Sequence, residues 1–216
     1  MANLDTATLL RLHQCAYRML LHIDRRAVDD PTWLTPEVVE LLVDGSSCVQ
    51  WLRDNERVLP LELLPEREYE DAFARLLASF FEVSFEVRHS ELGGVFYGTR
   101  LQTRRRQRGH GSGQLRAMIA QAVRATLASE GVRLDYNSAM TLARREDLRL
   151  DARIVAYIHE LRCRAYGESK GSPVHGLWRS IPVDVRTSLN EETVWLARSR
   201  IREAADALLR VQCGHQ

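Results

Sequence analysis

Lysine is almost absent from this chain, and the signatures of several protein classes are missing as well. Only Lys170 is a lysine, and the other 29 of the 30 basic residues are arginines. The four cysteines lie far apart and form no Cys-x-x-Cys pair, which favours reduced thiols over a disulfide framework or a zinc site. No uncharged apolar run approaches the ~18–20 residues of a membrane span, and the first residues lack the basic start of a signal peptide. We therefore expect a cytoplasmic protein without membrane contact.

Catalytic motifs are equally scarce. The sequence contains no Gly-x-Ser-x-Gly elbow, no phosphate-binding P-loop and no dinucleotide-binding glycine set. His159-Glu160 lacks the second histidine of a zinc-binding His-Glu-x-x-His helix, and His13 and His22 are nine residues apart, which places them on different faces of a helix. The sequence therefore predicts a protein that is not an enzyme and that holds no metal or other cofactor.

The charge of the chain is balanced only in total. The net charge is +1, but residues 1–91 carry 9 arginines and 17 acidic residues, a net of −8, whereas residues 92–216 carry a net of +9. Such an asymmetry indicates an acidic and a basic surface with different partners. On this basis we divide the chain into an acidic N-terminal helical half, 1–91, and a basic C-terminal helical half, 92–216, which can also form one continuous domain.

Apolar residues recur at helical spacing along most of the chain, which predicts an all-α fold, a bundle of six to seven helices. The first helix has an apolar stripe of Leu9, Leu12, Ala16, Met19, Leu20 and Ile23. Helix starts are expected near Asp5 or Thr6, at Thr35-Pro36, at Pro65, at Ser112, after Asn137, after Asp151, and at the capping-box spacing Ser188-x-x-Glu191. The last helix has an expected stripe of Val194, Ala197, Ile201, Ala204, Leu208 and Val211.

One stretch fits two secondary structures. Val83, Phe85 and Val87 alternate with polar residues, and Gly93-Gly94 precedes another apolar run. This pattern predicts either one small β-hairpin near 83–97 or a continued helix. Residues 98–113 and 167–176 have no apolar period and are expected to be polar loops.

The strongest local feature is the arginine-rich segment, residues 98–113, with the sequence GTRLQTRRRQRGHGSG. It has five arginines in nine positions, and no acidic residue occurs between Thr99 and Glu130. Guanidinium groups pair with phosphate oxygens through two hydrogen bonds, and the glycines of this segment allow backbone amides to approach a phosphate. The basic character continues into the following helices. We expect nucleic-acid backbone contacts, without base-specific readout, from Arg100, Arg104, Arg105, Arg106, Arg108, Arg116, Arg124, Arg144 and Arg145. The alternative is a solvated surface whose arginine content reflects a GC-rich genome.

Two arrangements of arginine and histidine resemble the helical nucleases called HEPN, in which an arginine precedes a histidine by four to six residues. Arg105 and His110 have this spacing, within a glycine-rich segment. Arg164 and His175 lie in a C-terminal layout similar to that of some members but are eleven residues apart. The resemblance implies RNA cleavage with histidine as general acid and base, an alternative function for the chain.

The size, the helical layout and the arginine-rich segment GTRLQTRRRQRGHGSG together resemble the small all-helical subunit of CRISPR effector ribonucleoproteins. The resemblance implies a non-catalytic subunit in antiviral defence that contacts RNA or single-stranded DNA, with other protein subunits as partners. The charge asymmetry adds head-to-tail self-association as a further expectation. A protein–protein adaptor without nucleic-acid contact is the third alternative.

Overall fold

The computed structural model describes residues 4–30, 32–44, 47–88, 112–168 and 173–213. Within these ranges the protein is all-α, with no strand, which confirms the predicted fold class. The ten α-helices of the described residues exceed the expected six to seven. They are α1 (Thr6–Asp29), α2 (Pro36–Asp44), α3 (Cys48–Asp54), α4 (Glu70–Arg88), α5 (Ser112–Ser129), α6 (Tyr136–Arg144), α7 (Arg149–Ala165), α8 (Pro173–Ser180), α9 (Val183–Ser188) and α10 (Glu191–Cys213). Short 3₁₀ turns are η1 (Leu61–Leu63), η2 (Arg67–Tyr69) and η4 (Glu146–Leu148).

The chain divides into two compact units. The first unit comprises residues 1–108 and 161–172, and the second comprises residues 109–160 and 173–216. The units are not the same as the acidic and basic halves of the sequence, because residues 161–172 belong with the N-terminal helices. Helix α7 contributes its residues 149–160 to the second unit and its last turn to the first.

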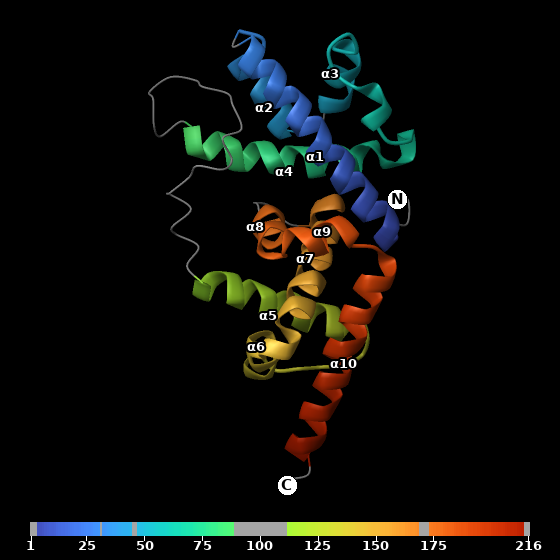
Figure 1. The fold of residues 1–216 in the computed structure, drawn as a ribbon, viewed down its shortest axis with the longest axis vertical. Coiled ribbons are helices and arrows are strands. Elements are labelled where there is room, and N and C mark those ends of the chain that lie inside the picture. Colours follow the sequence, from blue (N-terminus) through green and yellow to red (C-terminus); the bar gives the residue numbers. More distant parts are fainter. Residues whose placement is uncertain (1–3, 31, 45–46, 89–111, 169–172, 214–216) are drawn as a thin grey trace. The chain divides into compact units, whose positions relative to one another are not determined.

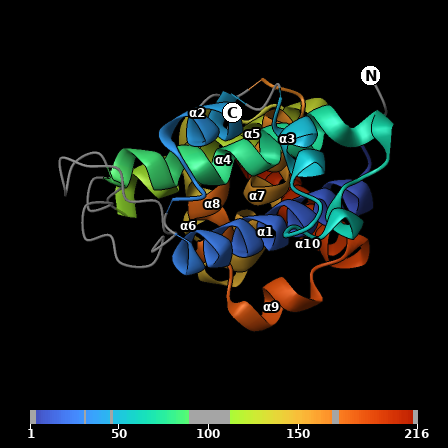
Figure 2. The ribbon, with the colours of Figure 1, turned by 90° about the horizontal axis from the view of Figure 1, so that it is seen from above.

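In the first unit, α4 packs against α1 and α2 (Figure 2). Helix α1 begins where Asp5 caps it, because the carboxylate accepts a hydrogen bond of 2.7 Å from the amide of Thr8. Its predicted apolar stripe is fully buried, together with Phe73 and Phe80 of α4. The ring of Phe80 lies 5.2 Å from that of His13 and 5.6 Å from that of Tyr17. The N-terminal unit therefore has an aliphatic and aromatic core.

The last turn of α7 is held in the first unit by hydrogen bonds between distant parts of the sequence. The hydroxyl of Tyr166 accepts from the amide of Leu4 at 3.1 Å. Arg75 of α4 donates to the carbonyl of Ala165 at 2.8 Å, and Arg164 donates to the carbonyl of Arg75 at 3.2 Å. These bonds to main-chain groups fix residues 161–168 against α1 and α4.

In the second unit, α5 packs against α6 and α8, and α6 packs against α10 (Figure 1). Gly131 follows the end of α5, with a φ of 84°, and the amide of Val132 donates a hydrogen bond of 2.9 Å to the carbonyl of Leu127. The fully buried Tyr157 of α7 lies 5.2 Å from the ring of Trp178 of α8. Burial raises the pKa of the Tyr157 hydroxyl well above its ordinary value, so this residue belongs to the core.

The structure corrects several expectations of secondary structure. Helix α4 continues to Arg88, so residues 83–88 follow the continued-helix alternative rather than the β-hairpin near 83–97, and residues 89–97 lie outside the described residues. The expected polar loop 167–176 contains the start of α8, and the short helix α9 was not expected. Helix α6 begins at Tyr136, capped by Asp135, rather than after Asn137. Each error concerns a short segment, where an apolar period has too few residues to be recognised.

Helix α10 also differs from its predicted start and buried face. The cap is Asn190 rather than Ser188: its side-chain oxygen accepts from the amide of Thr193 at 3.0 Å, and the Thr193 hydroxyl accepts from its amide at 2.9 Å. Val194 and Ile201 are buried as expected, but Val211 is 61% exposed. Its predicted stripe therefore runs beyond the core of the unit, where α10 extends past α6 (Figure 1).

Candidate nucleic-acid interface

The predicted interface is described only in part. Arg100, Arg104, Arg105, Arg106 and Arg108 lie outside the described residues. The other predicted arginines belong to the second unit: Arg116 and Arg124 lie on α5, Arg144 is the last residue of α6, and Arg145 follows it. All four are exposed.

Helix α5 carries positive charge without negative charge. Its 18 residues include Arg116 and Arg124 and no acidic residue. The two arginines are eight residues apart, which places them on one side of the helix. Ala120 lies between them in the same row and is fully buried. The arginines therefore flank a covered point of the helix rather than forming an uninterrupted stripe.

The two arginines at the end of α6 differ in their contacts. Arg145 donates two hydrogen bonds to Asp147, from Nε at 3.1 Å and from a terminal nitrogen at 2.6 Å. This pairing raises the pKa of Arg145 and lowers the pKa of Asp147. Arg144 has no ion pair among the described residues. Arg144 is therefore the better of the two for an external phosphate, because Arg145 would first have to release Asp147.

The start of α7 adds an arginine pair that was not placed in the predicted site. Arg149 is exposed, and Arg153 follows one turn later and donates to the carbonyl of Ser180 at 2.8 Å. Burial, followed by the repulsion of Arg149, lowers the pKa of Arg153. The sequence signal for this pair was its spacing of four residues. Arg149 and Arg153 are therefore close enough for their like charges to act on one another.

The acidic residues next to this basic surface are engaged inside the second unit. Glu130, at the end of α5, accepts hydrogen bonds of 3.0 and 2.5 Å from Arg198 of α10 and lies 4.0 Å from Arg202. Asp135 accepts from the amide of Ser138 at 2.8 Å and from its hydroxyl at 2.9 Å, and these bonds lower the pKa of Asp135. Neither carboxylate therefore neutralises Arg116, Arg124 or Arg144, which leaves the α5–α6 pair cationic.

Neither arginine–histidine arrangement forms a described nuclease site. Arg105 and His110 lie outside the described residues. Arg164 is 6% exposed and bonded to a main-chain carbonyl of the first unit. His175 belongs to the second unit, and its side chain is outside the description. This hydrogen bond of Arg164 joins the last turn of α7 to α4.

The described side chains also bear on metal binding and on catalysis by a cysteine nucleophile. No group of three or more histidine, cysteine, aspartate or glutamate residues among them could hold a metal ion. Burial raises the pKa of the Cys48 thiol to about 12, so this cysteine is protonated and inert as a nucleophile near neutral pH. Within the described part of the chain, no helix is both long enough and apolar enough to cross a lipid bilayer.

The sequence interpretation missed a second group of arginines in the acidic half. Arg11, Arg18 and Arg25 of α1 are seven residues apart and exposed. Their regular spacing was the signal that could have revealed them, because seven residues make almost two helical turns.

The comparisons with known proteins add no relative. No protein-family model, no curated protein sequence and no solved structure matches this chain.

Proposed function

We propose that this protein is a non-catalytic helical subunit that binds the sugar–phosphate backbone of RNA or single-stranded DNA. The observation that carries the proposal is the state of the charges on α5 and α6. Arg116, Arg124 and Arg144 are exposed and have no ion pair among the described residues, while the nearby Glu130 and Asp135 are engaged within the unit. Free guanidinium groups on a rigid surface are suited to phosphate oxygens.

The sequence adds further arginines before this surface. The arginine-rich segment runs into the start of α5, and its five arginines lie 8 to 16 positions before Arg116. Contacts of this kind recognise phosphate without reading bases, so binding is expected to be independent of sequence and strongly weakened by salt. The resemblance to the small subunit of CRISPR effector ribonucleoproteins supports a place in a cytoplasmic antiviral complex with other protein subunits.

The proposal is tested by removing the unpaired arginines. Binding to a fluorescent 30-nucleotide single strand of mixed sequence, as RNA and as DNA, is measured by anisotropy at several salt concentrations. The variant R116A/R124A/R144A should bind at least about tenfold more weakly at low salt and show a smaller salt dependence, because three phosphate contacts are lost. Circular dichroism verifies the helical fold, which should be kept because all three side chains are exposed.

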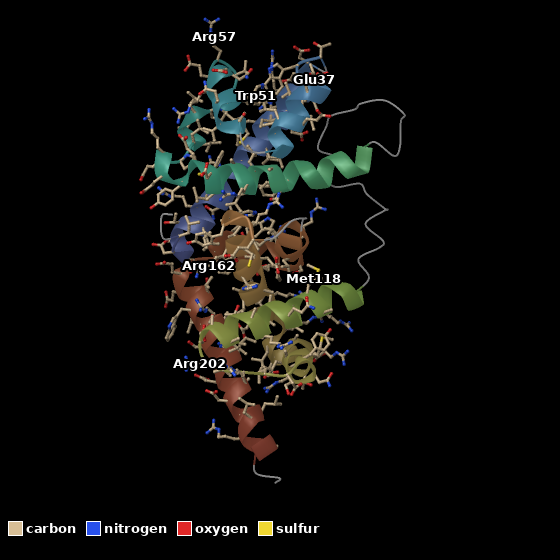
Figure 3. All side chains as sticks on the ribbon, turned by 180° about the vertical axis from the view of Figure 1, so that it is seen from behind. Glu37, Trp51, Arg57, Met118, Arg162 and Arg202 are labelled. Atoms are coloured by element: carbon tan, nitrogen blue, oxygen red, sulfur yellow. The ribbon has the colours of Figure 1, made fainter. Side chains whose placement is uncertain are left out.

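The matched control is R57A/R67A/R210A, which removes the same charge from exposed sites elsewhere. Figure 3 shows Arg57 beyond α3, far along the first unit from α4. The control should change affinity by no more than about twofold, since distant surface charges are screened by salt. Equal losses in both variants would reduce the effect to net charge and contradict the proposal. RNA cleavage that disappears in H110A/H175A would replace it with the nuclease alternative.

A further inference from the structure

Helix α1 presents two parallel lines of exposed residues. One line consists of Ala7, Gln14, Leu21 and Val28, and the other consists of Arg11, Arg18 and Arg25. Within each line the residues are seven apart, so they follow the helix axis with a drift of only ~20° per step. Each arginine is four residues from a member of the first line, which makes the two lines neighbours.

The apolar members of this surface face water. Leu21 is 46% exposed and Val28 is 68% exposed. The opposite face of α1 is fully packed, with Leu12, Met19 and Ile23 at 1% exposure or less. A single exposed apolar side chain is ordinary. Two of them at the same heptad position, bordered by arginines, form an apolar line that runs along the helix axis.

The arginines of the surface are poorly neutralised. Arg18 and Arg25 have no ion pair among the described residues. Arg11 lies 4.0 Å from Glu66 and 6.0 Å from the ring centre of Tyr69, both contacts at the limit of a useful interaction. The surface therefore carries positive charge in a unit whose helices are otherwise rich in carboxylates.

We propose that this face of α1, defined by Arg11, Arg18, Leu21, Arg25 and Val28, docks an acidic amphipathic helix of a partner protein. A partner helix with heptad-spaced glutamates repeats every ~10.5 Å, the same repeat as the arginines. An apolar line beside those glutamates would cover Leu21 and Val28. A phosphate backbone repeats charge but has no apolar group to place against these two side chains, which favours protein over nucleic acid here. The proposal does not depend on nucleic-acid binding by α5 and α6.

The probe is a designed 28-residue helical peptide with leucine once per heptad and glutamates on both sides of the leucine line. Its counterpart has lysine at every glutamate position. Fluorescence anisotropy at low salt should show saturable binding of the glutamate peptide with one peptide per chain, and at least about tenfold weaker binding of the lysine peptide.

Three variants locate the binding. R18E/R25E should weaken the glutamate peptide by at least about tenfold and should reverse the preference, so that the lysine peptide now binds better. L21S/V28S should weaken the binding of both the glutamate peptide and the lysine peptide, because it removes the apolar contact. R57E/R67E makes the same charge reversal outside α1 and should stay within about twofold of the unchanged protein. All substituted residues are exposed, and circular dichroism verifies that the helices are kept.

Several results would overturn the proposal. These are no saturable binding of the glutamate peptide, equal affinity for both peptides, or equal losses in R18E/R25E and R57E/R67E. Displacement of the peptide by single-stranded RNA would make α1 a nucleic-acid surface instead. Self-association that L21S/V28S abolishes, measured by sedimentation, would make a second copy of this chain the occupant.

Discussion

Single residues fix the ends of helices, and the observed caps decide between candidates that the sequence left open or chose wrongly. At α1 the sequence left Asp5 and Thr6 open, and Asp5 caps the helix by accepting from the amide of Thr8. At α10 the capping-box spacing selected Ser188, but the cap is Asn190. The difference lies in Thr193, whose hydroxyl accepts a hydrogen bond from the amide of Asn190. Caps are therefore ambiguous in the sequence where neighbouring polar residues compete.

Gly167 has a left-handed backbone conformation and lies beside Arg75. Its φ is 75°, and a Cβ there would lie 3.4 Å from the Nε of Arg75. A terminal nitrogen of the same side chain donates to the carbonyl of Ala165. Gly131 has a similar φ of 84°, but its Cβ would meet nothing within 4 Å. Gly131→Ala should therefore lower the free energy of unfolding by about 1 kcal/mol, through backbone strain alone. Gly167→Ala should cost the same strain, about 1 kcal/mol, because a Cβ at 3.4 Å from Arg75 makes an ordinary van der Waals contact and displaces nothing.

Urea unfolding followed by circular dichroism measures both changes. Gly176→Ala is the control, because Gly176 lies inside α8 with open space around it, so alanine should stabilise the helix slightly. A loss at Gly167 clearly larger than that at Gly131 would contradict this expectation and show that the Arg75 side chain cannot accommodate the added carbon.

At the scale of elements, length decided what could be predicted. The helices α1, α5, α7 and α10 have at least 17 residues each and were all expected, because their apolar stripes repeat several times. Helices α8 and α9, with 8 and 6 residues, were missed. The alternation of Val83, Phe85 and Val87 suggested a strand, but these residues continue α4. A helix already formed extends at low cost, so its context overrides a short alternating pattern.

The candidate site shows the same limit in side-chain contacts. The sequence predicted Arg116 and Arg124 as phosphate contacts, and both are exposed. The pairing of Arg145 with Asp147 was not predicted, because residues two apart meet only in the non-helical turn after α6. The contact between Glu130 and Arg198 joins residues 68 positions apart and depends on the packing of the second unit.

Glu130 couples the packing of α10 to the charge of α5. Glu130→Gln removes the carboxylate that Arg198 and Arg202 share, and should lower the free energy of unfolding by about 1 kcal/mol. Under the proposed function the same change releases positive charge beside α5, so affinity for a single strand should rise and its salt dependence should steepen. Anisotropy and urea unfolding of one preparation measure both effects. Asp147→Asn is the control, because it removes the carboxylate of the other ion pair and releases Arg145. A Glu130→Gln protein that binds the strand more weakly while still folded would contradict the assignment of α5 to the interface.

For the whole molecule, the polarity of the sequence rests largely on one segment. Residues 92–216 have a net charge of +9, but residues 114–216, with 16 basic and 12 acidic residues, have a net of only +4. The two structural units are close to neutral, with net charges of −1 for residues 1–108 and 161–172 and +2 for the remainder. The charges on which the two proposals rest are therefore local, in the arginine-rich segment, on α5 and α6, and on α1, rather than spread over an acidic and a basic half.

The salt dependence of binding can distinguish how these local charges are used. Each phosphate contact on a single strand contributes about 0.7 to the slope of log affinity against log salt. R104A/R105A/R106A/R108A should therefore reduce the slope by up to about 3, and R116A/R124A/R144A by up to about 2. If the arginine-rich segment and α5–α6 contact one strand together, the seven-arginine variant should show the sum of the two reductions, as expected for independent sites. If the segment and α5–α6 each hold a strand separately, each of the two variants should keep one binding site with an unchanged salt slope. The stoichiometry should then fall from two strands per chain to one. An unchanged slope in R104A/R105A/R106A/R108A would exclude the segment from binding and leave α5 and α6 as the only interface.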